Sequence, residues 1–227
     1  NPPCASPSST VGNPKTGLRL FQSARHFEVG TQSHAGSRDK QDAELVAKPM
    51  RIGITGASGF IGSHLLRALK QQRNITVSTF QRNSKNSFDA SRLKAFVKNK
   101  DLIYHLAGVN RGTDEEILRD NIIGTFNLVQ SIKANASSVR IVFASSVQVY
   151  KPDAGRVGED GAAEPASLYG LSKKAAEDII RLSGLDYVIL RISNVYGPGC
   201  RPNYNSVIAT FCDRAVRSQP LVINGDG

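Results

Sequence analysis

The chain has 227 residues, of which 40% are hydrophobic and 7% aromatic, and its formal net charge is +10. This length suits one globular domain with a sizeable core, or such a domain with a tail. No apolar run approaches the roughly 18 residues of a membrane span, so no membrane contact is expected. Because the lysines and arginines are scattered, the charge predicts a solvated surface and contacts with a diphosphate ligand rather than with nucleic acid.

The cysteines are few. Cys4, Cys200 and Cys212 are odd in number and widely spaced. They fit neither a disulfide framework nor a CxxC zinc site, so no metal is expected and a reducing, cytoplasmic compartment is predicted.

The first 49 residues differ from the rest in composition. They begin with a small, polar, proline-rich segment and show no periodic apolar pattern before Leu45. Such a composition predicts a disordered, nonessential extension. Met50, the only methionine of the chain, then marks a candidate true start. The alternative is a targeting peptide, since residues 1–27 carry no Asp or Glu.

From Met50 onward, short apolar runs alternate with amphipathic stretches. Several of the runs are almost wholly apolar, which is typical of a parallel sheet covered on both faces. The fold class is therefore predicted as α/β, a Rossmann-type doubly wound parallel sheet with helices on both faces and its ligand crevice at the strands' carboxyl ends. In chain order the predicted elements are strand 51–55, helix 60–72, strand 75–80, helix 91–98, strand 102–105, helix 115–134, strand 140–144, helix 168–183, strand 187–191 and helix 207–217.

A glycine-rich turn links the first predicted strand to the first predicted helix. Residues 55–62 read Thr-Gly-Ala-Ser-Gly-Phe-Ile-Gly. Three glycines at this spacing allow a tight turn and a close approach of backbone N–H groups to a pyrophosphate. The positive end of the helix then faces the phosphates. The alternative is a turn of no functional meaning.

Tyr169 and Lys173 stand four residues apart, which places a phenol and an ammonium on one helix face. A nearby cation favours the phenolate of a tyrosine. Such pairs also occur on ordinary surface helices. Ser146 favours the functional interpretation, because it follows a buried strand and its hydroxyl would join the tyrosine at a substrate oxygen.

From about Met50 to Gly227 the chain resembles the extended short-chain dehydrogenase/reductases, specifically the nucleotide-sugar epimerase/dehydratase/reductase group. The resemblance rests on seven motifs in the family's order, with Lys151 in place of one family glycine. The motifs are the glycine turn 55–62, Asp89, His105-Leu106-Ala107-Gly108, the Asn-x-x-Gly-Thr run 121–125, the Ser-Ser-x-x-Val-Tyr run 145–150, Tyr169 with Lys173, and the Arg-x-x-Asn-Val-Tyr-Gly-Pro-Gly run 191–199.

The resemblance implies a role for each matched residue. Tyr169 would be the acid/base on the sugar hydroxyl or ketone, Ser146 would hydrogen-bond the same oxygen, and Lys173 would bind the nicotinamide ribose and lower the pKa of Tyr169. The implied cofactor-binding set is Gly56, Gly59, Phe60, Ile61, Gly62, Asp89, Leu106, Ala107, Gly108, Asn121, Tyr169 and Lys173, and the candidate substrate contacts are Ser146, Asn194, Arg201 and Asn203.

Plainer alternatives remain for some of these positions. Asn121 would equally serve as a buried helix asparagine that satisfies the backbone, and Arg201 and Asn203 would equally be exposed loop residues. His105 is interpreted as a strand-end residue rather than a catalyst.

Residues 146–148 narrow the reaction. The family's dehydratases carry a Thr-Asp-Glu run where this chain has Ser146, Val147 and Gln148, so a sugar 4,6-dehydratase is disfavoured. A 4-epimerase and a ketoreductase remain. Residues 105–111 and 201–212 closely resemble stretches of bacterial capsular-polysaccharide and O-antigen sugar reductases. This resemblance favours a ketoreductase but does not exclude a 4-epimerase.

The end of the second strand bears on the cofactor. Residues 78–83 contain no Asp or Glu to bind the ribose 2′-hydroxyl of NAD. Arg82, with Lys85 nearby, would instead pair with the 2′-phosphate of NADP. NADP is therefore preferred over NAD, the alternative being that Arg82 is merely a loop cation.

The expected organisation is an extension 1–49, an NAD(P)-binding Rossmann domain 50–199 and an incomplete start of the substrate-binding part 200–227. A complete member of the family is longer, so a C-terminal truncation is expected. The expected partners are a UDP- or dTDP-sugar and, for the full-length protein, a second copy in a homodimer. The alternative function is a non-catalytic NAD(P)-binding regulatory protein, or an inactive fragment of such an enzyme.

Overall fold

The computed structural model of the protein describes residues 48–81, 89–135, 138–152 and 155–223. All of them belong to the compact unit Val46–Gly227. The predicted extension 1–49, apart from its last two residues, and the predicted NADP determinant Arg82 lie outside the described residues. The predicted boundary at 199/200 stays a prediction.

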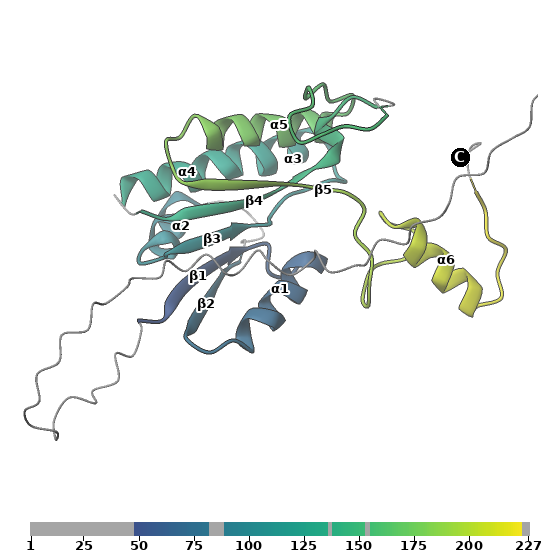
Figure 1. Ribbon diagram of the computed structural model, residues 1–227, viewed down its shortest axis with the longest axis horizontal. Helices are drawn as coiled ribbons and strands as arrows, with labels where there is room; N and C mark the ends of the chain where they lie inside the picture. Colours follow the sequence, from purple (N-terminus) through teal and green to yellow (C-terminus); the bar gives the residue numbers. More distant parts are fainter. Residues whose placement is uncertain (1–47, 82–88, 136–137, 153–154, 224–227) are drawn as a thin grey trace, which may run out of the picture. The chain divides into compact units, whose positions relative to one another are not determined.

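A five-stranded parallel sheet forms the centre of this unit, as Figure 1 shows. The strand order is β2-β1-β3-β4-β5, and every pairing is parallel. The chain moves outward from β1 to β2 and then crosses back to β3, so the order reverses between β1 and β3, where doubly wound folds bind their ligands. The predicted Rossmann-type fold is thus confirmed. The strands are β1 Met50–Thr55, β2 Ile75–Phe80, β3 Leu102–His105, β4 Arg140–Ser146 and β5 Tyr187–Ile192.

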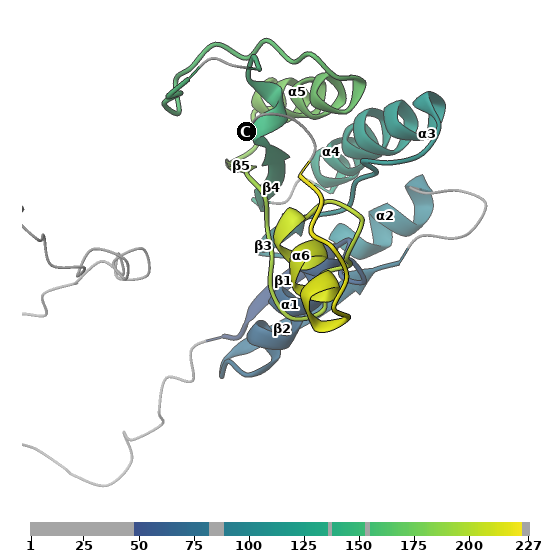
Figure 2. The ribbon, with the colours of Figure 1, turned by 90° about the vertical axis from the view of Figure 1, so that its right-hand side faces the viewer.

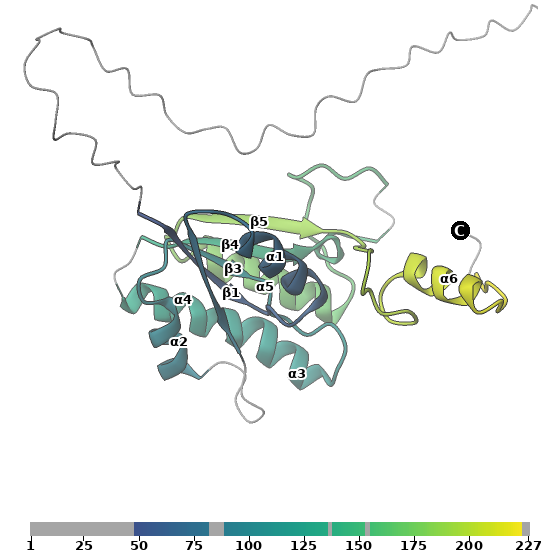
Figure 3. The same cartoon turned by 90° about the horizontal axis from the view of Figure 1, so that it is seen from below.

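Helices lie on both faces of the sheet. α2 (Ala90–Val97), α4 (Gly124–Ala134) and α5 (Leu168–Arg181) lie side by side along one face, as Figures 1 and 2 show. α1 (Phe60–Lys70) covers the opposite face, and in Figure 3 it stands in front of the sheet with α5 behind. α6 (Val207–Val216) follows the long segment after β5 and has no buried residue. In the described part of the chain, no helix is long and apolar enough to cross a membrane.

The core fills the space between the sheet and the α2/α4/α5 layer. Its side chains come from every second position of β3 and β4 and from the inward faces of the helices, as the periods of strand and helix require. Burying each large apolar side chain contributes roughly 1.5–3 kcal/mol. Its fully buried members include Leu93, Val97, Ile103, Leu128, Ile132, Ile141 and Ile180.

The helix predicted over 115–134 is divided. α3 (Asp114–Leu118) begins with a capping box between Thr113 and Glu116, and a π-helical turn, η1 (Arg119–Ile123), separates it from α4. The wider turn carries Asn121, whose side chain bonds the loop after β3 instead of facing outward. The other predicted elements end within two residues of the observed ones, and strands 75–80 and 102–105 match them at both ends.

Candidate active site

The glycine turn is packed too tightly for side chains at two positions. Gly56 has φ of +75°, and a Cβ added there would lie 2.6 Å from the backbone nitrogen of Ala107. A Cβ on Gly62 would lie 2.1 Å from the carbonyl oxygen of Gly56. α1 begins at Gly59, which offers no side chain to cap it. The first N–H groups of α1 therefore remain available to an anion, as a pyrophosphate cradle requires.

The segment after β3 lies against this turn. The N–H of Leu106 donates to the carbonyl of Thr55 over 3.1 Å, and the N–H of Ala107 donates to the Thr55 hydroxyl over 3.3 Å. A Cβ on Gly108 would lie 3.1 Å from Asn121 Oδ1 and 3.7 Å from Lys173 Nζ. The predicted cofactor segments 55–62 and 106–108 are thus together, and Gly108 joins them to the predicted catalytic helix.

Ser146, Tyr169 and Lys173 come together from two elements. Ser146 is the last residue of β4, and the other two lie on α5, whose start is fixed by the Ser167 hydroxyl accepting from the Gly170 N–H over 3.0 Å. The side chains of Ser146 and Tyr169 share a hydrogen bond. Ser146 is 8% exposed and Lys173 4%. The arrangement can hand a proton to an oxygen placed beside the serine and the phenol.

Burial shifts the pKa values of both Tyr169 and Lys173. Burial raises the pKa of Tyr169, and the hydrogen bond from Ser146 only partly opposes it. Burial also lowers the pKa of Lys173 to about 7, against the opposing charge of Glu177, and Lys173 Nζ stands 4.1 Å from the centre of the Phe143 ring. Lys173 is not among the groups that shift the pKa of Tyr169 here, so the lowering of that pKa by Lys173 stays a prediction.

Asn121 satisfies the backbone and also reaches the catalytic helix. Its Oδ1 accepts from the Val109 N–H and its Nδ2 donates to the Val109 carbonyl, each over 2.8 Å. Nδ2 also donates to the Ser172 hydroxyl over 2.9 Å. Asn121 thus satisfies the backbone, as one interpretation predicted, and ties the loop after β3 to the residue beside Lys173. Its cofactor contact stays a prediction.

A buried histidine network, which the sequence did not reveal, lies beneath the site. His105, the last residue of β3, is 1% exposed; its Nδ1 stands 2.7 Å from the Thr55 hydroxyl and its Nε2 3.0 Å from the Thr125 hydroxyl. Thr125 donates its proton to the Asn121 carbonyl, so it accepts from Nε2–H. Nδ1 then accepts from Thr55, which leaves the Thr55 oxygen to accept from Ala107. The neutral Nε2–H tautomer therefore orders the chain of hydrogen bonds from the glycine turn to η1.

This network predicts a specific loss of stability in mild acid. Burial, together with the charge of Lys173, lowers the pKa of His105 from 6.5 to about 3. In this pH range His105 binds a proton in the unfolded chain but not in the folded chain. The free energy of unfolding therefore decreases as the pH falls from about 6.5 towards 3. Between pH 6 and pH 5 we expect the free energy of unfolding to fall by about 1 kcal/mol from this group. Denaturant unfolding of a His105→Gln variant should lack this slope, and an unchanged slope would contradict the assignment.

The segment after β5 is tied to the site's edge from two directions. His64 of α1 bonds the carbonyl of Pro198 over 2.9 Å. Arg111, from the loop after β3, stacks on the Tyr204 ring at 4.6 Å and donates to Asn205 Oδ1 over 3.1 Å. These contacts position the segment that carries the predicted substrate residues. Those residues, Asn194, Arg201 and Asn203, are all exposed, and in the described part of the chain no contact joins them to Ser146 or Tyr169.

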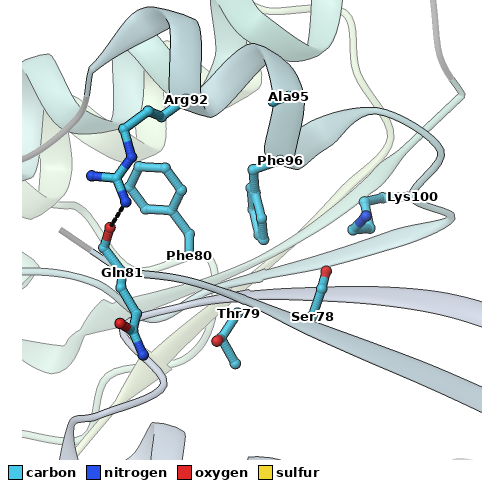
Figure 4. Close-up of a pocket in the computed structure, with 8 residues that line it drawn as sticks. All are labelled: Ser78, Thr79, Phe80, Gln81, Arg92, Ala95, Phe96 and Lys100. Atoms are coloured by element: carbon cyan, nitrogen blue, oxygen red, sulfur yellow. Dashed lines mark hydrogen bonds between the residues drawn. The ribbon is translucent and has the colours of Figure 1, made fainter.

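A pocket of about 440 Å³ lies between β2 and α2, as Figure 4 shows. Arg92 reaches across it from the first turn of α2 and donates to the carbonyl of Gln81 over 3.0 Å, just past the end of β2. Its Nη1 and the Ser78 hydroxyl are buried and have no partner among the described residues. Asp89, predicted at the adenine side, accepts from the Arg92 N–H over 3.0 Å and caps α2. The adenine contact of Asp89 stays a prediction.

A doubly wound sheet, a glycine turn at its switch point and a Ser–Tyr–Lys set define the class of extended short-chain dehydrogenase/reductases. The chain belongs to the NAD dependent epimerase/dehydratase family, whose model matches residues 52–227.

Individual relatives differ in reaction. The chain is 36% identical over 180 residues to a UDP-2-acetamido-2,6-beta-L-arabino-hexul-4-ose reductase of Pseudomonas aeruginosa, covering 77% of this chain and 44% of that protein. It resembles the structure of UDP-glucuronic acid 4-epimerase from Bacillus cereus in complex with UDP-glucuronic acid and NAD, with a TM-score of 0.67, 29% identity and coverage of 78% and 67%. It also resembles RMD from Pseudomonas aeruginosa complexed with NADPH, with a TM-score of 0.63, 27% identity and coverage of 74% and 62%. The chain thus spans less than half of the reductase.

Proposed function

We propose that the chain carries the cofactor-binding and catalytic part of an NAD(P)-dependent oxidoreductase or epimerase acting at the C4 hydroxyl or ketone of a nucleotide-diphosphate sugar. The observation that carries the proposal is the hydrogen-bonded Ser146–Tyr169 pair, with buried Lys173 one turn further along α5. Gly108, between Asn121 and Lys173, links this pair to the pyrophosphate cradle. The reductase and epimerase relatives support the substrate class.

The chain's own residues would supply orientation and a proton. When bound, the nicotinamide supplies or accepts the hydride. Ser146 would hold the sugar oxygen against Tyr169, and the phenol would donate its proton to a ketone or take the proton of a hydroxyl. Because the raised pKa keeps Tyr169 protonated at neutral pH, the resting site is set to donate.

The proposed cofactor is NADP in preference to NAD. Arg82 is the arginine that the sequence predicts for this role. Arg92 is a second candidate: its guanidinium stands at the end of β2 and has a buried N–H with no hydrogen-bond partner among the described residues. The 2′-phosphate of NADP is an acceptor of matching charge, and an arginine near this strand end is the usual means of binding it. One relative's structure holds NADPH and another NAD, so the family accommodates both.

Arginine substitutions should therefore change cofactor selectivity. We expect Arg82→Ala and Arg92→Ala each to weaken NADPH binding roughly tenfold or more, because each removes a charged hydrogen bond to the 2′-phosphate. NADH has no 2′-phosphate, so its binding should change little. Fluorescence titration with both cofactors measures the ratio. Lys94→Ala removes an exposed cation from the same helix and should leave both affinities unchanged. Equal losses for NADPH and NADH would remove the argument for NADP.

The proposal also covers the nucleotide of the sugar substrate and the oligomeric state of the full-length protein. A UDP-sugar is favoured over a dTDP-sugar because the named substrates of the relatives are UDP-linked. A homodimer of the full-length protein is supported by exposed apolar side chains on adjacent helices, Ile123, Phe126 and Leu171. The two described cysteines, Cys200 and Cys212, are free thiols; the reducing, cytoplasmic compartment stays a prediction.

A further inference from the structure

A buried carboxylate stands behind the catalytic pair. Glu177 follows Tyr169 and Lys173 at intervals of four on α5, so the three side chains share one face of the helix. Glu177 is 0% exposed. A carboxylate in such a place is costly unless cations and donors surround it, and an apolar side chain of similar size is often at least as stable. Its presence therefore calls for a reason beyond packing.

Three elements converge on this carboxylate. The Ser145 hydroxyl, from the end of β4, donates to Oε1 over 2.5 Å. Arg191 of β5 donates from Nε over 3.1 Å and from Nη2 over 2.8 Å, in the fork geometry of a bidentate pair. Arg181, one turn along α5, adds an ion pair of 3.0 Å. Glu177 thus fixes the end of β4, the catalytic helix and the end of β5 to one another.

Lys173 needs such a neighbour. Its Nζ faces the Phe143 ring, and in the part of the chain that the structure describes no hydrogen bond from Nζ is found. Burial disfavours its charged form, and Glu177 is the group that opposes this effect. Other titratable groups on the elements around Lys173 include the buried His105 of β3 and Asp120 of η1, Tyr169 of α5 and Arg191 of β5, whereas Asp114, Glu115 and Glu116 of α3 are exposed. His105 is neutral and Arg191 already pairs with Glu177.

We propose that Glu177 is a positioning residue for the proposed reaction: its carboxylate, held by Ser145 and Arg191, stabilises the ammonium form of Lys173 and fixes Ser146 relative to Tyr169. The inference rests on the proposed function. Glu177 does not itself touch the reacting atoms. It acts through Lys173, whose charged form the buried negative charge favours, and through Ser145, which directly precedes Ser146.

The test is the titration of Lys173, which needs neither cofactor nor substrate. In protein labelled with ¹³C at the lysine Cε, the Lys173 signal is assigned by its disappearance in a Lys173→Arg variant. We expect the Lys173 midpoint in Glu177→Gln to move down by about one pH unit or more, because a nearby opposite charge favours the charged form. Asp178→Asn removes an adjacent, more exposed carboxylate that pairs with Lys174 and should leave the midpoint in place.

Turnover gives the second readout. Activity that requires charged Lys173 is lost as the pH rises through its pKa, so Glu177→Gln should be about tenfold less active than wild type at neutral pH and recover at lower pH. Glu177→Asp retains the charge and should restore most of the wild-type pH profile. A purely structural role would lower activity equally at every pH.

The outcomes separate the two proposals. An unmoved Lys173 midpoint in folded Glu177→Gln overturns this inference, even in an active enzyme. A moved midpoint in a full-length protein that turns over no nucleotide sugar supports the inference about Lys173 and overturns the proposed function. Where Glu177→Gln does not fold, Glu177→Met carries the test, because methionine fills a similar volume without the charge and should move the midpoint down in the same way. An unmoved midpoint there overturns the inference.

Discussion

Phenylalanine in place of Tyr169 should lower turnover about a thousandfold, within the range that a positioned acid or base contributes. The substitution removes only the hydroxyl, which shares a hydrogen bond with Ser146. The ring is partly buried and its packing is retained. Cofactor affinity should therefore change little, because the pyrophosphate cradle belongs to a different segment, residues 56–62. Steady-state rates and cofactor titration of the same preparation measure both effects.

The matched control is Tyr187→Phe, which removes an equivalent hydroxyl from the exposed first residue of edge strand β5. Its turnover should equal that of wild type. Retained activity in Tyr169→Phe would show that another group moves the proton. A parallel loss in both variants would instead indicate a general effect on folding.

Alanine at Gly62 should damage cofactor binding through the backbone alone. The new Cβ would lie 2.1 Å from the Gly56 carbonyl oxygen and 2.8 Å from the Ala57 Cα. Both are backbone atoms, so the turn must move away from α1. We expect about 2 kcal/mol of lost stability and a cofactor dissociation constant raised about a hundredfold. Calorimetric cofactor titration and denaturant unfolding measure the two losses.

Gly158→Ala serves as the control, because nothing lies within 4 Å of a Cβ added there. It should bind cofactor as wild type does. If Gly62→Ala binds as tightly as Gly158→Ala, the turn is not the pyrophosphate site. If Gly62→Ala is unstable but binds normally where folded, close packing is its only role.

The strand order and the meeting of the glycine turn with residues 106–108 were predictable from the sequence. Parallel strands joined by helices leave few topologies, and the carboxyl ends of neighbouring strands share one edge of the sheet. Ser146 and Tyr169 follow the same logic. Each stands where a motif places it, at a strand end or in the helix after it.

Other features of the site depend on contacts distant in the sequence. The π-helical turn at Asn121 has no periodic signal, because an apolar face runs through this stretch of the sequence. The structure shows it in the backbone, where the Gly124 N–H donates to the Arg119 carbonyl five residues earlier. The raised pKa of Tyr169 reflects how deeply α5 is buried, which spacing does not report. Glu177 had a local signal, its interval of four from Lys173. Its role in holding two strands becomes visible only in the structure, where Arg191 of β5 and Ser145 of β4 both bond its carboxylate.

The central claim is that Tyr169 moves a proton at a nucleotide-sugar oxygen beside a bound nicotinamide. Its most direct test mixes the full-length protein with NADPH or NAD and with UDP- and dTDP-sugars in their 4-keto and 4-hydroxyl forms, following the absorbance of reduced nicotinamide and the sugar products by NMR. The account predicts that a UDP-linked sugar is converted at C4 by wild type and not by Tyr169→Phe, although both bind the cofactor. A full-length protein that binds the cofactor and leaves every one of these sugars unchanged would contradict it.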